Sequence, residues 1–240
     1  NQNGNLASVR GFLAAMRGDS QAAALLEEAV ADETLLMRWQ SQTQLAKLAM
    51  EEGSFRDART LLDSALTSDA ASDTVRYLRG LCLYALGDRS DAQLAFDEVS
   101  ARGGVHATDA LILLADTQLS LRQVDLALRS IEKASEAGAR NAVYHTVRGR
   151  VAAARDKLAD ARNSFSGAIK MDEDYAPAWL ERGLLFIRRG AVSEGLRDLE
   201  RYLEIIGEDA AGTNAEAVRT LVEQLQGSAE ILSSARRIGP

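Results

Sequence analysis

The chain has 240 residues, of which 46% are hydrophobic, 5% are aromatic and two are prolines. Alanine and leucine dominate the apolar residues, which favours an all-α fold, and no apolar run is long enough to predict a membrane-spanning segment. The formal net charge of −7 arises from residues 1–120, and this acidic half argues against nucleic acid as a partner.

The predicted elements follow one pattern, in which small residues flank a turn and a bulky residue comes after them. The copies in chain order are 10–26, 45–62, 79–96, 114–131, 147–165 and 182–199. Their reference small residues lie 34 or 35 residues apart, at Gly11, Ala46, Gly80, Ala115, Gly149 and Gly183. An unbroken period of this length indicates a repeat architecture.

Each copy is expected to form two helices, as residues 79–96 illustrate. Apolar residues at helical spacing precede Gly87, a glycine suited to the left-handed conformation that ends a helix. Asp88 is well suited to the N-cap position of the next helix. Gly80 and Ala92 would let the two backbones approach closely, and Phe96 would fill the space beyond them. The pattern therefore predicts a tightly packed helical hairpin.

Beyond residue 209 the pattern changes to a single amphipathic helix. Thr213 and Asn214 form a helix start, and the apolar residues of 213–226 share one stripe. The end of a helical stack exposes an apolar face, which such a helix can cover. We therefore predict that 210–240 forms a capping helix and a tail.

These residues resemble the tetratricopeptide repeat family, whose 34-residue helix–turn–helix unit has small and aromatic residues at fixed places. The fifth copy matches them with Gly149, Ala161, Phe165 and Ala168. The resemblance implies a right-handed α-solenoid over residues 1–209, with units at about 4–37, 39–72, 73–107, 108–141, 142–175 and 176–209. The family's late proline is missing from every unit. In the sixth unit Gly195 and Leu199 replace the usual alanine and aromatic residue, which predicts looser packing there.

The sequence offers no constellation that indicates catalysis. The histidines are His106 and His145, and a single cysteine allows no zinc-binding spacing. The glycines recur with the hairpin period rather than in a phosphate-binding loop after a strand. We therefore expect no catalytic residue, no metal ligand, no cofactor and no enzyme activity.

Cys82 is the single cysteine, so the chain cannot form an internal disulfide and lacks the cysteine pattern typical of disulfide-rich secreted proteins. Its apolar neighbours predict a buried thiol. The chain begins at Asn1 within a helical pattern, so we expect it to be a piece of a longer protein, with any signal or anchor outside it. A cytoplasmic location is favoured, and a periplasmic one stays open.

The resemblance implies that the first helix of each unit lines a concave groove for a peptide or a partner helix. Transferring the family's groove positions gives these partner-binding candidates: Thr43, Lys47, Tyr77, Leu81, Tyr84, Ile112, Asp116, Arg150, Leu180 and Leu184. The two tyrosines fit a core role as well as a binding role. Arg150 and Asp116 fit an ion pair between neighbouring units better than a ligand contact.

Two further observations narrow the kind of partner. Lys47 is the one groove lysine, and no asparagine accompanies it, which argues against the dicarboxylate clamp of chaperone-binding members. An arginine recurs directly before the small residue, and we expect it to reach solvent over a packed stem rather than to bind a ligand. These arginines are Arg10, Arg79, Arg148 and Arg182.

The sequence thus predicts a non-catalytic scaffold that binds a protein or peptide partner. Four lysines against 24 arginines fit a GC-rich genome and suggest a bacterial multiprotein assembly. Two alternatives stay open. The chain could be the regulatory or targeting region of a larger enzyme, or it could assemble with itself into a homo-oligomer.

Overall fold

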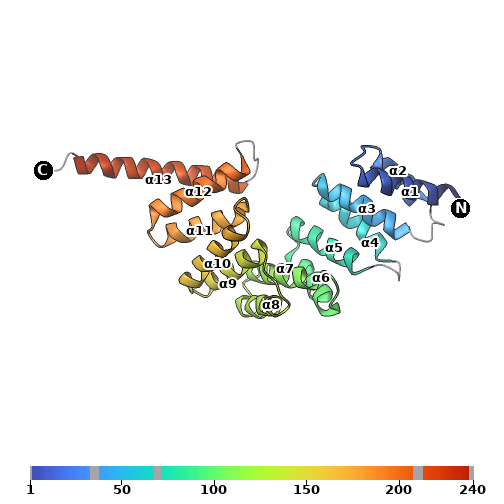
Figure 1. Cartoon of the computed structure of the whole chain (residues 1–240), viewed down its shortest axis with the longest axis horizontal. Coiled ribbons are helices and arrows are strands. Elements are labelled where there is room, and N and C mark those ends of the chain that lie inside the picture. The colour runs from blue at the N-terminus through green and yellow to red at the C-terminus, as the bar shows by residue number, and fades with distance from the viewer. Residues whose placement is uncertain (1, 33–37, 68–71, 208–212, 238–240) are drawn as a thin grey trace. The chain divides into compact units, whose positions relative to one another are not determined.

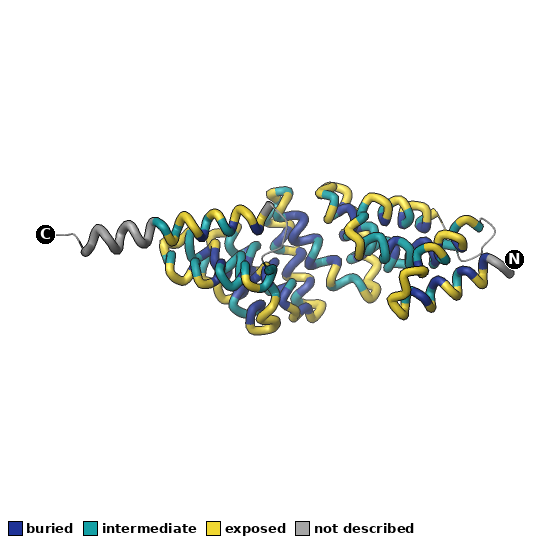
Figure 2. The backbone as a smooth tube through the Cα atoms, turned by 90° about the horizontal axis from the view of Figure 1, so that it is seen from above, coloured by how far each residue is buried: buried dark blue, intermediate teal, exposed yellow. Residues whose placement is uncertain are grey.

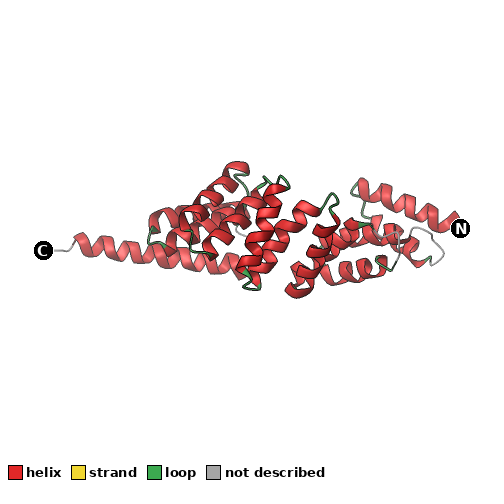
Figure 3. Cartoon of the chain, turned by 90° about the horizontal axis from the view of Figure 1, so that it is seen from below, coloured by secondary structure: helices red, strands yellow, loops and turns green. Residues whose placement is uncertain are grey.

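The computed structural model describes residues 2–32, 38–67, 72–207 and 213–237, and side chains are described for 4–32, 38–67, 72–207 and 214–227. Within these ranges the chain forms thirteen α-helices and no strand (Figure 3). The predicted all-α helical repeat fold is therefore confirmed. None of the helices in the described part of the chain combines the length and apolarity that crossing a bilayer requires.

The chain divides into two compact units, Asn1–Gln123 and Val124–Pro240. In the first unit each helix packs against the next one along the chain (Figure 1). Its helices are α1 Gln2–Met16, α2 Ala22–Ala31, α3 Arg38–Glu51, α4 Phe55–Ala65, α5 Asp73–Leu86, α6 Arg89–Arg102 and α7 Ala107–Ser120.

The second unit is built in the same way, and its helices also pack in sequence order. Its helices are α8 Val124–Glu136, α9 Ala142–Ala154, α10 Leu158–Met171, α11 Ala176–Arg188, α12 Val192–Ile206 and α13 Thr213–Arg237. Alternate helices also touch, with α1 on α3 and α3 on α5 in one unit and α9 on α11 in the other. The assignment of six repeats to 1–209 and of a cap and tail to 210–240 stays our proposal.

The small residues lie where one helix of a hairpin meets the bulky residue of the other. A Cβ atom added to Gly80 would stand 2.7 Å from Cε1 of Phe96, and one added to Gly149 would stand 2.6 Å from Cδ1 of Phe165. Both rings are fully buried, and no methyl group fits into either gap. The predicted packing of a small residue against a bulky one is confirmed at these hairpins.

Packing in the hairpin of α11 and α12 differs from our expectation. A Cβ on Gly195 would lie 2.5 Å from Cδ1 of Ile187. The isoleucine therefore occupies the space that an alanine methyl takes in other copies. The prediction of looser packing here is wrong, because a larger side chain on α11 compensates for the missing methyl on α12.

Buried positions recur along the whole backbone (Figure 2), and several clusters of buried residues lie between one hairpin and the next helix. One cluster joins α3, α4 and α5 and includes Leu62 and Cys82. The pKa of the Cys82 thiol is raised to about 11, mainly by burial. The nearby Asp63 carboxylate also raises this pKa, and its effect is larger than the lowering by the Arg59 guanidinium. Cys82 is thus buried, as predicted, and its thiol is protonated at neutral pH.

The turn inside each hairpin contains one residue in the left-handed conformation, again every 34 or 35 residues. These residues are Gly18, Gly53, Gly87, Arg122, Asp156 and Gly190. The next residue donates its N–H to a carbonyl five positions back, for example Asp88 to Leu83 at 2.9 Å and Gln123 to Gln118 at 2.8 Å. This is the hydrogen bond of a Schellman helix end. Arg122 and Asp156 therefore adopt a backbone conformation that favours glycine.

We expect Arg122→Gly to raise the free energy of unfolding by up to about 1 kcal/mol. The left-handed conformation, at φ 63°, costs a side-chain-bearing residue roughly 1–2 kcal/mol, and the greater freedom of glycine in the unfolded chain offsets part of that gain. Arg122→Ala is the control, because it removes the charge but keeps the Cβ atom. Urea denaturation followed by circular dichroism measures both, and an equal gain in the two variants would contradict the explanation.

Candidate functional site

On α5 of the first unit, the predicted groove residues Tyr77, Leu81 and Tyr84 are half-buried and pack against one core cluster. The rings of Tyr77 and Tyr84 lie with their centroids 6.3 and 6.4 Å from that of Phe96. One face of each tyrosine therefore belongs to the core, and the rest of the ring contributes to the surface. The core role that the sequence left open is thus seen for part of each ring, and the binding role stays a prediction.

The outer end of Tyr77 is held by His106 at the start of α7. Their rings are stacked with centroids 4.5 Å apart and planes 3° from parallel. The Thr74 hydroxyl lies 3.0 Å from Nε2 of the same imidazole. Burial raises the pKa of Tyr77 to about 12, and the Asp109 carboxylate adds to this effect. Tyr77 is thus a neutral, fixed aromatic surface at physiological pH.

The Tyr84 side chain is held by two charged residues, Asp116 at its hydroxyl and Arg89 over its ring. Its hydroxyl donates a hydrogen bond to the Asp116 carboxylate on α7. The Arg89 guanidinium lies 4.3 Å from the ring centroid and donates to the Tyr84 carbonyl. Arg89 therefore stacks on the ring as a cation on a π system. These contacts hold the side chain in one orientation between α5, α6 and α7.

The other candidates of the first unit differ in accessibility. The hydroxyl of Thr43 donates to the Trp39 carbonyl at 2.6 Å, and its side chain is buried on α3. Lys47, one turn further along α3, is half-buried. Ile112 and Asp116 on α7 are buried. Lys47 and the α5 residues are therefore the accessible members of this set.

In the second unit, Arg150 and Leu184 lie on neighbouring helices. Nε of Arg150 on α9 stands 3.2 Å from Oε1 of Glu181 on α11. Leu184, one turn after Glu181, is 39% exposed. Both residues of α11 line a hollow of about 130 Å³ that Ala153 closes from α9. The structure thus brings an exposed leucine and an ion pair together on α9 and α11, the first helices of two successive hairpins.

Leu180 is directed elsewhere, since it packs against the cluster that joins α12 and α13. Its neighbours there include Leu199, Tyr202 and Val218. Leu180 is half-buried and does not line the hollow beside Leu184. The ion pair expected between Arg150 and Asp116 would join the two units, and it stays a prediction.

The recurring arginines have different environments. Arg79 pairs with Asp63 on α4. Arg182 binds both carboxylate oxygens of Asp198, at 2.7 and 2.8 Å, and its side chain is 18% exposed. Arg10 is exposed on α1. Arg182 is therefore more deeply packed than the predicted stem-packed, solvent-reaching side chain.

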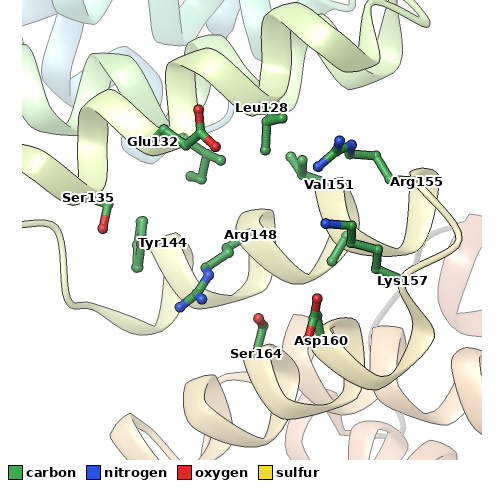
Figure 4. Close-up of a pocket in the computed structure, with 12 residues that line it drawn as sticks. Leu128, Glu132, Ser135, Tyr144, Arg148, Val151, Arg155, Lys157, Asp160 and Ser164 are labelled. Atoms are coloured by element: carbon green, nitrogen blue, oxygen red, sulfur yellow. The ribbon is translucent and has the colours of Figure 1, made fainter.

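Arg148 lines a cleft that the sequence did not predict. This cleft measures about 370 Å³ and lies between α8, α9 and α10 (Figure 4). Its basic residues are Arg148, Arg155 and Lys157, and its acidic residues are Glu132 and Asp160. Arg148 on α9 and Arg155, the residue that follows the helix, are seven residues apart, which predicts one shared face and was the available signal.

A larger cleft, of about 620 Å³, lies between α2, α3 and α4 of the first unit. Leu45, Leu48 and Leu61 line it, together with the acidic residues Glu27 and Asp57. The leucines suit an apolar group. No three histidine, cysteine, aspartate or glutamate side chains gather as a metal site would require anywhere in the described ranges.

Comparison with known proteins agrees with this architecture. A family model described as tetratricopeptide repeat matches residues 43–88 and 146–222, which together make up just over half of the chain. A search of curated proteins found no significant match. Several solved structures share the fold at low sequence identity.

A tetratricopeptide repeat protein from Parabacteroides merdae has a TM-score of 0.77 and 17% identity, with 96% of this chain and 89% of that one covered. PilW, a type IV pilus biogenesis factor, has a TM-score of 0.70 and 16% identity over 91% and 99%. YrrB, described as having an unusual peptide-binding site, has a TM-score of 0.54 and 20% identity over 78% and 95%. The helices, their packing and the family match agree, and the chain belongs to the tetratricopeptide repeat family.

Proposed function

We propose that this chain is a non-catalytic scaffold that binds a peptide segment or helix of a partner protein along its first helices. The observation that carries the proposal is the exposed Leu184 beside the Arg150–Glu181 ion pair, at the edge of a hollow between α9 and α11. An apolar side chain next to oriented charges can anchor a partner residue and fix its direction.

The α5 surface of the first unit supports the same function. Tyr77 and Tyr84 are already held by His106 and Asp116, so their rings lose little freedom when a partner covers them. Preorganisation of this kind lowers the entropic cost of binding. YrrB has a peptide-binding site and PilW acts in pilus biogenesis, which supports a partner-binding role within a bacterial assembly.

We expect Leu184→Glu to reduce capture of the natural partner at least tenfold. A charged side chain would replace the apolar anchor at an exposed position, where it costs the fold little. The control is Leu126→Glu on α8, since that leucine is 37% exposed and lies outside the hollow. Quantitative mass spectrometry after affinity capture from the native organism compares the three proteins. Equal capture by both variants would reject Leu184 as an anchor.

Self-assembly is a second candidate function, and the surface of α1 favours it. Leu6, Val9, Leu13 and Met16 are 48%, 56%, 47% and 84% exposed. Their spacing of three, four and three residues puts them in one stripe along the helix, as in a coiled-coil seam. Adjacent exposed apolar side chains of this kind are typical of contact surfaces. A second copy of the chain could cover the stripe.

If the chain associates through α1, its mean mass in solution will rise with concentration, and Leu6→Gln/Leu13→Gln will abolish the rise. Both leucines are exposed, so their replacement removes apolar contact area while the hairpin stays folded. Leu94→Gln, at a 69% exposed leucine of α6, is the matched control. Light scattering over a concentration series measures the effect. A constant monomer mass in the unmodified protein would exclude this candidate.

A further inference from the structure

Among the described residues of the second unit, one of the recurring arginines lacks the polar contact that its counterparts make with the preceding second helix. Arg79 pairs with Asp63, sixteen residues earlier on the preceding second helix, and Arg182 donates to Ser166, also sixteen residues earlier. The residue at this position for Arg148 is Glu132. In the described part of the chain no ion pair joins Arg148 to Glu132, and both line the cleft between α8, α9 and α10.

Three cationic side chains surround this cleft, and none of them forms an ion pair with the described residues. They are Arg148, Arg155 and Lys157. Arg155 and Lys157 flank Asp156, whose left-handed conformation makes the tight turn between α9 and α10. Figure 4 shows the charged ends of Arg155 and Lys157 directed toward Val151, whereas the guanidinium of Arg148 points the other way and lies at the opposite end of the cleft.

The lowered pKa of the neighbouring His145 is consistent with this excess of positive charge. Burial lowers the pKa of its imidazole, and the guanidinium groups of Arg148 and Arg140 lower it further. A smaller hollow of about 180 Å³ beside the cleft is lined by His145 and shares Arg148 and Asp160 with it. Cationic side chains gathered in such a place are suited to an anionic group.

Part of the lining of the cleft is apolar, which restricts the kind of anion. Leu128, Ile131, Val151 and Ala152 contribute aliphatic surface beside the charged residues. The volume of about 370 Å³ lies at the lower end of the range for ligand pockets, roughly 300–1,000 Å³. Glu132 and Asp160 add carboxylates that could accept hydrogen bonds from peptide N–H groups, which a polyphosphate chain does not have.

We propose that this cleft binds an acidic peptide segment of a partner protein. Side-chain carboxylates of the segment pair with Arg148, Arg155 and Lys157, and one aliphatic side chain packs against Val151. The site is separate from the first-helix surface of α9 and α11, because α8 and α10 form its walls. A partner could therefore contact the second unit on two sides.

The experiment uses the whole chain, labelled with ¹⁵N, and titrates it with millimolar acetyl-Glu-Leu-Glu-amide in an NMR measurement. We expect saturable shifts of the amide signals of residues that line the cleft, and at least tenfold weaker binding of acetyl-Gln-Leu-Gln-amide. Arg148→Gln/Arg155→Gln should lower the affinity for the acidic peptide at least tenfold. Arg129→Gln on α8 is the matched control, because Arg129 is exposed but does not line the cleft.

Both cleft arginines are exposed, so the double variant is expected to keep its helicity, which circular dichroism verifies. The proposal is overturned if the two peptides bind equally, if the acidic peptide causes no shift in the cleft, or if Arg129→Gln weakens binding as much as the double variant. It is also overturned if a short oligothymidylate binds the cleft more tightly than the peptide. Loss of partner capture by Leu184→Glu is independent of all these outcomes, so the two proposals fail separately.

Discussion

Gly149→Ala is expected to lower the free energy of unfolding by about 1–3 kcal/mol. The added methyl group would stand 2.6 Å from Cδ1 and 3.0 Å from Cζ of Phe165, whose ring is 1% exposed and has no free space to enter. In an unobstructed helix the same substitution stabilises by roughly 1 kcal/mol, because alanine has the higher helix propensity. Packing is therefore expected to reverse the sign that propensity alone predicts.

A second substitution and a control separate the two effects. Gly149→Ala/Phe165→Leu should regain stability, because a smaller side chain makes room for the methyl group, much as Ala46 and Leu62 share one buried cluster. Gly227→Ala on α13 should stabilise by up to about 1 kcal/mol, since no atom of the described residues lies within 4 Å of its added Cβ. Urea denaturation measures all three. If Gly149→Ala and Gly227→Ala gave the same change, close packing would not explain Gly149.

The sequence predicts the hairpins because their signals are local and recur. A small residue opposite a bulky one recurs along the chain, as at Gly80 and Phe96 or at Gly11 and Leu26. The turns at Arg122 and Asp156 carry no such signal, since their left-handed backbone is imposed by the repeat period and not by the residue. The packing of Ile187 against Gly195 could not be predicted from a local pattern either, because the compensating side chain lies on a different helix.

The candidate site was less predictable, because it depends on which polar groups meet across helices. The Tyr84–Asp116 hydrogen bond joins α5 to α7, and the residues are 32 positions apart. Groove positions carried over from the family identified both residues but not their contact. The spacing of Arg148 and Arg155 was a weak signal for the cleft beside them, because the sequence does not show that Arg148 forms no ion pair with Glu132 among the described side chains.

The pair of Arg182 and Asp198 is the strongest polar contact of the recurring arginines. It is bidentate, the Asp198 side chain is 7% exposed, and the guanidinium also donates to Ser166 at 3.0 Å. The same guanidinium lies 5.0 Å from the ring centroid of Trp179. This arginine therefore connects α10, α11 and α12, and its charge depends on one carboxylate for compensation.

Asp198→Ala is expected to lower the free energy of unfolding by about 3–5 kcal/mol, because it leaves a largely buried guanidinium without its carboxylate. Asp63→Ala is the matched control. It removes the partner of Arg79 in a pair whose side chains are 33% and 45% exposed, and such pairs contribute about 0–1 kcal/mol. Replacing both charges, in Arg182→Met/Asp198→Leu, should recover most of the loss, since no uncompensated charge then remains. Urea denaturation compares the variants. A loss for Asp198→Ala no greater than that for Asp63→Ala would mean that Arg182 is solvated well enough to need no partner.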